Sequence, residues 1–416
     1  MPRIGKFPPF GKRFFRRARK LVGRCQFEHF WRAVMAIASL QGRRSLQRIE
    51  EVLNHHRTRQ AMASFLNQAL WDAPELLRQT ALDTLKQLRY RPGDLIYLIL
   101  DDTQKRKRGR KMQAVSKIFL HAERVFARGH TILGCALVYR GVIIPYAVSV
   151  YATAAFCTAS QAEAEPQDRL TFRKLTQMAA DVISTVSLPP KARVLVLFDS
   201  YYLCPTVLAA CQAAKFPFIS VAKKNRNFAP DGRPRDPRKL STYGRNVLQR
   251  SGRWQKVQGK KHRLAQRVGQ LSKAGRVKLV FSRRPAEKSW VALATNETRW
   301  SAQTVLRHYF HRWPIEVLFK MSKQYLGLGD YQVLRYRGVV RYLHLVLIAY
   351  LLLTHLALTE SSAQAAIQEQ AELRLPSIPE LQVKLRRMLW ENLITTMEKG
   401  SRTRSAARKL KEAMML

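Results

Sequence analysis

The chain has 416 residues, of which 46% are hydrophobic and 25% are charged, a composition that excludes a disordered or fibrous protein and predicts two or three domains. Lysine and arginine outnumber aspartate and glutamate by 74 to 28, which gives a formal net charge of +46. Because a field of this size attracts polyanions, the sequence indicates nucleic acid or an anionic membrane surface as the partner.

The apolar run LHLVLIAYLLLTHLAL at 343–358 is shorter than the ~20 residues that span a bilayer. His344, Thr354 and His355 interrupt it, so it predicts a buried core helix rather than a membrane span. The five cysteines form no CxxC pair, and the histidines show no zinc-site spacing against them. These features favour a cytoplasmic protein with reduced thiols and no membrane partner.

Residues 1–90 predict a helical, basic DNA-binding region. Apolar residues recur every three or four positions in RSLQRIEEVL (44–53) and along 63–88. Residues 1–24 hold nine Lys or Arg and no acid, which favours contact with DNA phosphates over a merely solvated helix face. The RPGD turn at 91–94 ends this region.

Residues 91–220 predict the first part of a mixed α/β core. Four β-rich apolar runs follow the turn, and the amphipathic segment 169–188 between the last two predicts a helix. The runs are LIYLIL (95–100), TILGCALVY (131–139), VIIPYAVSVYA (142–152) and ARVLVLFD (192–199). A strand, a helix and another buried strand in this order predict at least one parallel pair in the sheet.

Residues 221–298 predict a basic, β-rich insertion. Between 221 and 290 the sequence has 21 Lys or Arg against three acids, with short strand-like pieces such as RVKLVF. Helices are expected again from 302, so 299–358 is assigned to a second part of the core and 359–416 to a helical C-terminal region.

Carboxylates follow two of the apolar runs: LIYLIL leads into Asp101-Asp102-Thr103, and VLVLF leads into Asp199. A carboxylate at the end of a buried strand is either a turn or capping residue or part of a site that compensates its burial. Two such carboxylates in a strongly positive chain favour a metal site.

A third carboxylate lies in YFHRWPIEVLFKMSK, where Tyr309, Arg312, Glu316 and Lys323 are spaced by 3, 4 and 7 residues. On an α-helix these offsets place the four side chains within about one face. Spacing alone also allows a structural ion pair. Hard oxygen ligands from three distant carboxylates are those that Mg²⁺ or Mn²⁺ prefers.

These residues carry a family resemblance. The chain resembles the DDE cut-and-paste transposases of bacterial insertion sequences, in the group with a Y-x2-R-x3-E-x6-K signature, over roughly 95–330. The resemblance implies an RNase H-like catalytic core interrupted by a β-rich insertion between the second Asp and the Glu. It implies Asp101, Asp199 and Glu316 as catalytic, metal-binding residues, with two Mg²⁺ ions per site that Mn²⁺ is able to replace.

Two departures from the family pattern leave alternatives open. The first motif has two aspartates; Asp101 is favoured because Thr103 completes an Asp-x-Thr pattern, and Asp102 is the register alternative. Neighbouring side chains on a strand point to opposite faces, so only one of the two aspartates faces the site. Pro314 also interrupts the signature, so the helix either begins there as its N1 residue or bends there.

Further residues are expected to bind DNA. Arg312 and Lys323 would hold phosphates near the scissile bond, unless they form an intrahelical ion pair with Glu316, and Tyr309 would donate to the same backbone. Lys105, Lys107 and Lys320 are assigned to the same DNA contact. The resemblance also implies that Trp290 holds a flipped base while the transposon end closes into a hairpin; the alternative is a strand Trp packed in the core.

The sequence thus predicts a transposase that binds inverted repeats at transposon ends, cleaves DNA with divalent ions, and joins the 3′-hydroxyl to a target. Double-stranded DNA is the expected partner, with a homodimer in the DNA complex and a bacterial, nucleoid-associated location. The alternatives are an inactive DNA-binding descendant of such an enzyme and an RNase H-like nuclease that never joins strands.

Overall fold

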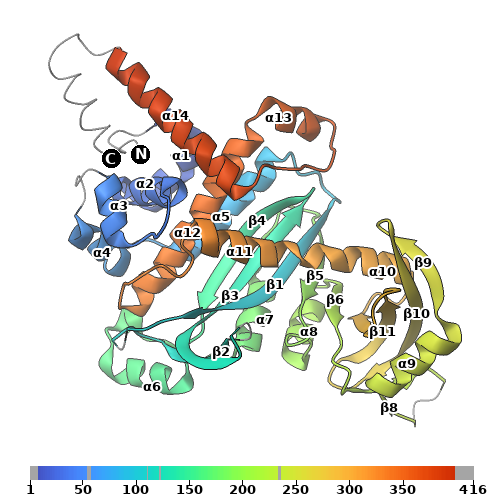
Figure 1. The fold of residues 1–416 in the computed structure, drawn as a ribbon. Coiled ribbons are helices and arrows are strands. Elements are labelled where there is room, and N and C mark those ends of the chain that lie inside the picture. Colours follow the sequence, from blue (N-terminus) through green and yellow to red (C-terminus); the bar gives the residue numbers. More distant parts are fainter. Residues whose placement is uncertain (1–7, 54–57, 110, 121–122, 233–235, 399–416) are drawn as a thin grey trace.

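The fold is a single mixed sheet with helices packed against it, as seen in a computed structural model that describes residues 8–53, 58–109, 111–120, 123–232 and 236–398 (Figure 1). The ends of the predicted terminal regions, 1–7 and 399–416, and residues 233–235 of the predicted insertion lie outside the described residues. Among the described residues the sheet has the order β2-β3-β1-β5-β6-β12-β11-β10-β7-β8, with β4 paired to β3 and β9 to β10.

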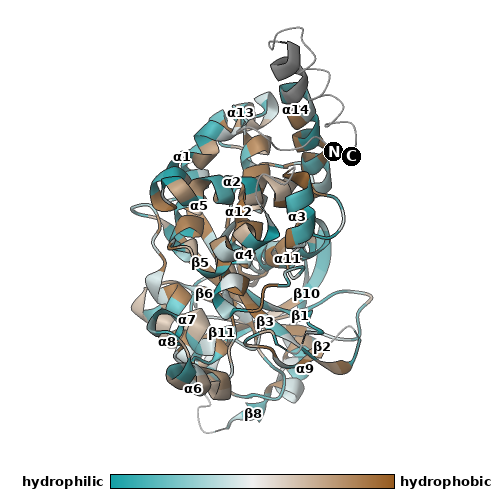
Figure 2. Cartoon of the chain, turned by 90° about the vertical axis from the view of Figure 1, so that its left-hand side faces the viewer, coloured by the Kyte–Doolittle hydropathy of each residue, from teal (hydrophilic) through white to brown (hydrophobic). Residues whose placement is uncertain are grey.

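The N-terminal region is helical, as predicted from its periodicity. Its helices are α1 (Gly11–Leu21), α2 (Arg24–Ser39), α3 (Leu46–Val52), α4 (Arg59–Asn67) and α5 (Ala73–Gln87). Helix α5 begins at a sequence signal, because the Asp72 carboxylate accepts from the Glu75 backbone N–H and Pro74 occupies the first turn. Figure 2 shows α1, α2, α3 and α5 gathered with α12 (Tyr336–Leu358) above the strand-rich half of the molecule.

Four of the core strands match the four predicted apolar runs, with one difference that matters for the site, and two strands, at 116–120 and 218–221, were not predicted. The strands are β1 (Leu95–Arg106), β2 (Ser116–Leu120), β3 (Val125–Tyr139), β4 (Val142–Val150), β5 (Arg193–Phe198) and β6 (Phe218–Val221). Strands β1, β5 and β6 are parallel neighbours, which confirms the predicted parallel pairing. Strand β1 does not end at Leu100, because its polar second half stays paired with β3 as far as Arg106.

Short helices connect these strands. They are α6 (Ala154–Glu163), the 3-10 turn Pro166–Asp168, α7 (Leu175–Thr185) and α8 (Pro205–Ala213). Helix α7 is shorter than the amphipathic segment 169–188 that predicted it.

The predicted insertion extends the same sheet rather than forming a separate one. It contains β7 (Asn227–Pro230), β8 (Arg238–Lys239), α9 (Leu240–Ser251), β9 (Arg253–Val257), β10 (Lys260–Leu271) and β11 (Gly275–Arg283). Strand β12 (Val291–Thr295) then returns to pair with both β11 and β6. The sequence analysis missed α9, whose buried Leu240, Val247 and Leu248 are too few to stand out in a basic segment.

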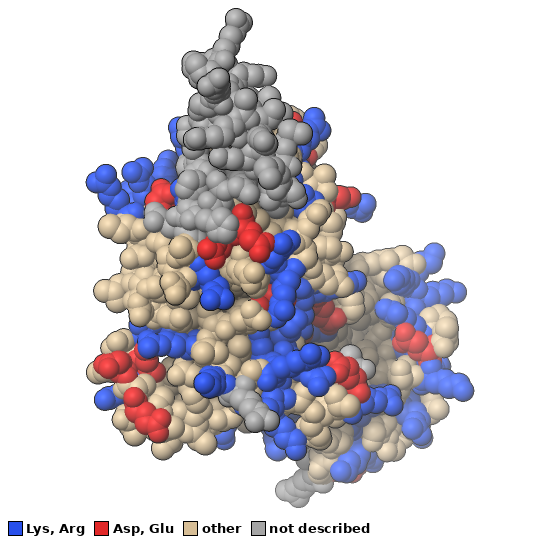
Figure 3. All heavy atoms as spheres, turned by 60° about the vertical axis from the view of Figure 1, so that its left-hand side comes forward, with Lys and Arg blue, Asp and Glu red and all other residues tan. Residues whose placement is uncertain are grey.

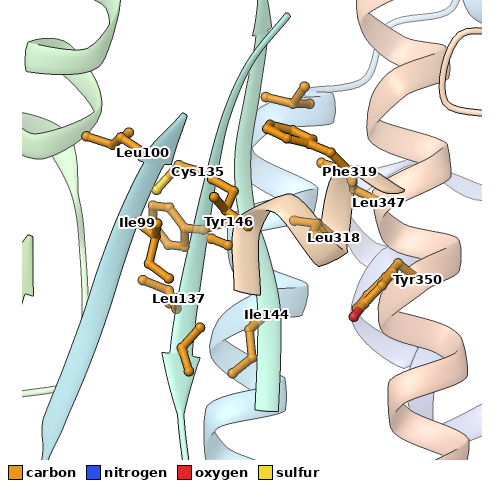
Figure 4. Close-up of a cluster of buried hydrophobic side chains, with 14 of the residues drawn as sticks. Ile99, Leu100, Cys135, Leu137, Ile144, Tyr146, Leu318, Phe319, Leu347 and Tyr350 are labelled. Atoms are coloured by element: carbon orange, nitrogen blue, oxygen red, sulfur yellow. The ribbon is translucent and has the colours of Figure 1, made fainter. Parts of the chain in front are cut away.

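The run at 343–358 belongs to α12, which is the central helix of the core. By length and composition α12 would be able to cross a membrane, but 94% of its most apolar window is buried inside the protein. In Figure 4, Leu347 and Tyr350 of α12 lie beside Leu318 and Phe319 of α11 (Pro314–Tyr325) and face Ile144 of β4. The remaining helices are α10 (Ala302–Tyr309), which precedes α11, and the C-terminal α13 (Ser361–Gln368) and α14 (Ile378–Glu398).

Three fully or nearly fully buried histidines make the fold sensitive to acid. Burial lowers the pKa of His130, His344 and His355 to about 4, from an ordinary value of 6.5. The unfolded chain therefore takes up protons first, and stability present above pH 6.5 is lost as the pH falls toward 4. We expect the free energy of unfolding to fall by ~1.4 kcal/mol per pH unit for each histidine in this window. Urea unfolding at pH 7, 6 and 5 measures this, and equal stabilities at the three pH values would contradict it.

Candidate functional site

Asp101 and Asp199 lie next to each other because of the parallel pairing of β1 with β5. The last paired residues are Leu100 and Phe198, so the two aspartates follow at the same level of neighbouring strands. The two carboxylates interact electrostatically, because the negative charge of Asp199 contributes to the raised pKa of Asp101. The main cause of that raised pKa, about 6, is burial, which Arg312 opposes. The sheet thus brings two sequence-distant carboxylates to one place.

The signature residues come from two helices joined by a tight turn. Helix α10 ends at Tyr309, a 3-10 turn covers Phe310–Arg312, and α11 begins at Pro314. The first of the two predicted alternatives for Pro314 is therefore confirmed, and Tyr309 and Arg312 lie before α11. Glu316 lies in the first turn of α11, where a negative charge is favourable at the helix N-terminus.

Arg312 joins the signature to β1. Its Nη1 donates to Asp101 Oδ2 at 2.9 Å, and its Nη2 donates to Glu316 Oε1. The Arg312 side chain is only 15% exposed. Burial by itself would lower the pKa of Arg312, but Tyr309, Asp101 and Glu316 outweigh it and raise the pKa. The fold thus brings Asp101, Glu316 and Arg312 into direct contact, and the charges of Asp199 and Glu316 both reach the hydroxyl of Tyr309.

Asp102 points to the other side of β1. Its Oδ1 accepts a hydrogen bond of 2.8 Å from the hydroxyl of Tyr202, a fully buried residue that follows β5. Burial, followed by the Asp102 charge, raises the pKa of that phenol, which keeps it a donor. Asp102 thus has a partner of its own away from Arg312 and Glu316. The assignment of Asp101 as the catalytic residue stays a prediction.

The lysines assigned to DNA differ in their surroundings. Lys320 is exposed on α11, and Lys105 is half-buried against Gly329. Lys323 Nζ donates to Thr103 Oγ1 at 2.6 Å and to the Gln104 carbonyl at 3.0 Å, so in this state it ties α11 to β1. Lys320 is the one of these lysines that is presented openly to solvent.

Lys107 does not fit its expected role at the DNA surface. It is 8% exposed, and its Nζ donates to the carbonyls of Gly329 and Tyr331 at 2.8 and 2.9 Å. The ammonium also lies 3.2 Å from the centre of the Tyr331 ring, a cation–π contact. These contacts hold the loop after α11 against β1, a structural role that the sequence did not indicate.

Trp290 is packed in the core, which was the alternative to base flipping that the sequence left open. It is 8% exposed, its ring packs edge-on against Phe281, and a Cβ added at Gly244 would come within 2.5 Å of it. The glycine on α9 therefore makes room for the indole inside the insertion. A base has no open ring face to stack on here, because the indole is buried among Phe281, Gly244 and the Lys224 side chain. The packing of Trp290 therefore favours a structural role over base flipping.

Trp313 is a side chain at the site that the sequence analysis missed. It follows Arg312 directly and is 62% exposed, whereas large apolar residues on a packed helix are normally covered. The sequence signal for the exposure of Trp313 was its position between Arg312 and Pro314, because neither of these residues belongs to the buried face of α11.

Gly134 sets the distance between α11 and β1. It pairs with Asp101 across the sheet, and a Cβ added there would lie 2.7 Å from the Phe319 ring. Figure 4 shows Phe319 directed at the strands from α11. The absent side chain lets α11 approach closely enough for Arg312 to reach Asp101.

Gly134→Val is expected to displace α11 and lose most of the activity of the site. Overpacking a core typically costs ~1–3 kcal/mol, so thermal unfolding should also occur at a lower temperature. Gly109→Val is the matched control, because nothing lies within 4 Å of that added Cβ. Equal activity of the two variants would show that the approach of α11 is not tightly set.

The donor set suits a divalent metal by its chemistry, since Asp101, Asp199 and Glu316 offer hard carboxylate oxygens. Among the described residues, no group of three or more His, Cys, Asp or Glu stands in a ligating arrangement. Here the guanidinium of Arg312 is the cation that contacts both Asp101 and Glu316.

Comparison with known proteins gives one family. Residues 24–279 match the model of the DDE superfamily endonucleases, a range that contains Asp101 and Asp199 and ends before Glu316. No curated protein matches the chain. The match spans more than half of the chain and includes both β1 and β5, the strands that bring Asp101 and Asp199 side by side. The chain therefore belongs to the DDE superfamily endonucleases.

Proposed function

We propose that this endonuclease is a transposase with the Y-x2-R-x3-E-x6-K signature, which cleaves transposon ends through a hairpin and joins them to target DNA. As a family member it is an enzyme of the nuclease or transposase type that acts on DNA and uses divalent metal ions. One observation carries the proposal: Arg312 of the signature bonds both to Asp101 of the first motif and to Glu316 of the third. A signature residue thus contacts two of the proposed catalytic carboxylates.

Each residue has a part in the proposed reaction. Asp101, Asp199 and Glu316 would hold two Mg²⁺ ions, for which Mn²⁺ substitutes. Such ions activate a water or 3′-hydroxyl and stabilise the leaving oxygen. Arg312 would turn from the carboxylates to a phosphate, which its fork binds through two oxygens. Tyr309 would donate to the same backbone, and Lys323 would keep α11 seated on β1 through Thr103.

The charge of the surface supports DNA as the ligand. Figure 3 shows Lys and Arg side chains in a band down the middle of one face, with Asp and Glu in small separate groups. A net charge of +46 exceeds what solubility requires. The proposal includes two copies of the chain holding the two ends, since a cut-and-paste reaction joins both ends to one target.

The test of cleavage and joining begins by sequencing the DNA on both sides of this gene, where the proposal expects short inverted repeats, and uses duplexes with those end sequences. Nicking, a hairpin product and strand transfer from a pre-cleaved 3′-hydroxyl end are each expected with Mg²⁺ and lost with a chelator. Cleavage without any transfer product would identify an RNase H-like nuclease instead. Binding of the ends without cleavage under any divalent ion would identify an inactive DNA-binding descendant.

DNA binding is expected to depend steeply on salt. If the basic N-terminal region and the insertion together neutralise about ten phosphates, the logarithm of the DNA-binding constant K should fall with the logarithm of the salt concentration at a slope of about −9. Fluorescence anisotropy with a labelled 30-base-pair duplex between 50 and 300 mM salt measures this slope. A slope shallower than about −3 would mean that the charge is not mainly a DNA-binding surface.

A further inference from the structure

The β2–β3 hairpin carries an aromatic and basic patch on the same face of the sheet as Asp101. Lys117 pairs with Arg128, and Phe119 pairs with Phe126, across the antiparallel ladder. Paired residues share a face, and residues two apart along a strand share it too. Because Asp101 pairs with Gly134 without a bulge in the β1–β3 ladder, Phe126 and Arg128 lie on the face of Asp101. We call Lys117, Phe119, Phe126 and Arg128 the hairpin face.

Phe126 is more exposed than any other aromatic side chain in the described part of the chain. It is 66% exposed although its ring contacts the edge of Phe119, with 5.0 Å between ring centres. Lys117 Nζ lies 4.5 Å from the centre of the same ring. Phe126 thus packs against its own hairpin, and this hairpin lies at the free edge of the sheet, where Figure 1 shows β2 as the last strand. The ring, with the cations beside it, is therefore open to a partner.

The charge around Phe126 identifies the partner. Lys117 and Arg128 lie beside Phe126 on the hairpin face, and the single acid between Lys105 and His130, Glu123, is neutralised by Arg106 at 3.5 Å. Without DNA to neutralise it, a second copy of this chain carries the same net charge of +46 and would be repelled from this face. Polyanionic DNA is attracted by the cations, and its stacked bases offer the apolar surface that Phe126 lacks.

We propose that the hairpin face is a second DNA contact, in which Lys117 and Arg128 hold phosphates while Phe126 enters the duplex between two base pairs and kinks it. Side chains such as Phe act as wedges of this kind in proteins that bend DNA through the minor groove. The inference rests on the proposed function, and it adds a deformation of the duplex at a point away from the cut.

The strand geometry gives the place of the wedge. Phe126 lies eight residues along β3 from Gly134, the partner of Asp101, which corresponds to about 26 Å at ~3.3 Å per residue. For a duplex that runs along β3, this length corresponds to about eight base pairs at ~3.4 Å per base pair. The wedge should therefore act about eight base pairs from the scissile phosphate, in the transposon end or in the target duplex.

The test places 2-aminopurine, which fluoresces when it is unstacked, at single positions five to eleven base pairs from the cleavage point. One series scans the inverted-repeat duplex and a second scans the target duplex joined to a pre-cleaved end, both with the full-length protein and Ca²⁺ to prevent cleavage. Increased fluorescence near the eighth base pair is expected in one of the series, and that series identifies which duplex is kinked. Phe126→Ala should abolish the increase and weaken binding of that duplex about fivefold or more, whereas Phe126→Trp should preserve both.

Val125 provides the matched control. It is 42% exposed beside Phe126 but points to the opposite face of β3, so Val125→Ala should leave fluorescence and affinity unchanged. Equal losses in Val125→Ala and Phe126→Ala, or no fluorescence change for the wild-type protein while it binds and cleaves normally, would overturn the wedge and leave the proposed function standing. A wild-type protein that neither binds nor cleaves either duplex would overturn both.

Discussion

Alanine at Asp101, Asp199 or Glu316 is expected to reduce DNA cleavage by at least about 1,000-fold while end binding changes little. Each carboxylate supplies a hard ligand for the ions, whose stabilisation of the transition state is worth several kcal/mol, and ~4 kcal/mol corresponds to a 1,000-fold rate. Binding depends on the many cations elsewhere on the surface. Single-turnover cleavage of a labelled end, with affinity measured on the same duplex, separates the two effects.

Asp102→Ala is the control for the register of the first motif. It leaves the buried hydroxyl of Tyr202 without the carboxylate that accepts its hydrogen bond, at a cost of ~1–3 kcal/mol in stability. Cleavage by this variant is expected to remain near wild type, because Asp102 points away from Arg312 and Glu316. Loss of cleavage in Asp102→Ala with activity kept in Asp101→Ala would move the catalytic assignment by one residue.

Arg312→Ala is expected to strengthen divalent-ion binding to the DNA-free protein and to weaken cleavage. The guanidinium bonds to the same oxygens of Asp101 and Glu316 that the ions require. A hydrogen bond to a charged group is worth ~1.5–3 kcal/mol, so removing the competitor should tighten Mn²⁺ binding by about 10- to 100-fold. Calorimetric titration of the DNA-free protein with Mn²⁺ measures this without any turnover.

Arg312→Lys separates phosphate binding from a structural ion pair. Lysine keeps the positive charge but lacks the two-oxygen fork, so cleavage of bound ends should fall even though the fold is retained.

Breaking a buried pair costs ~3–5 kcal/mol, so Arg312→Ala should also unfold at a lower temperature. Unchanged cleavage and Mn²⁺ binding with lowered stability in Arg312→Ala would show that Arg312 serves as a structural pair alone.

The sequence by itself determined the main helices and strands of the core and the kind of partner. Apolar periodicity located the helices before residue 90, the buried α12 and the four β-rich runs, because burial of one face is a local pattern. The acids that follow two of those runs, and the spacing from Tyr309 to Lys323, indicated the residues that β1, β5 and α11 bring together. The excess of Lys and Arg indicated DNA, because net charge depends on composition and not on the fold.

Only the tertiary structure decided which of these side chains meet. The reach of Arg312 to Asp101 depends on Gly134 and the close approach of α11, a contact across 211 residues that no local pattern encodes. Asp102 faces Tyr202 and not Arg312, because the pairing register of β1 places alternate residues on opposite faces of the sheet. Lys107 and Trp290 were predicted from the sequence to bind DNA, but both are buried in the fold. The sequence gives the charge or the ring of a side chain, whereas its burial depends on residues that are distant in the chain.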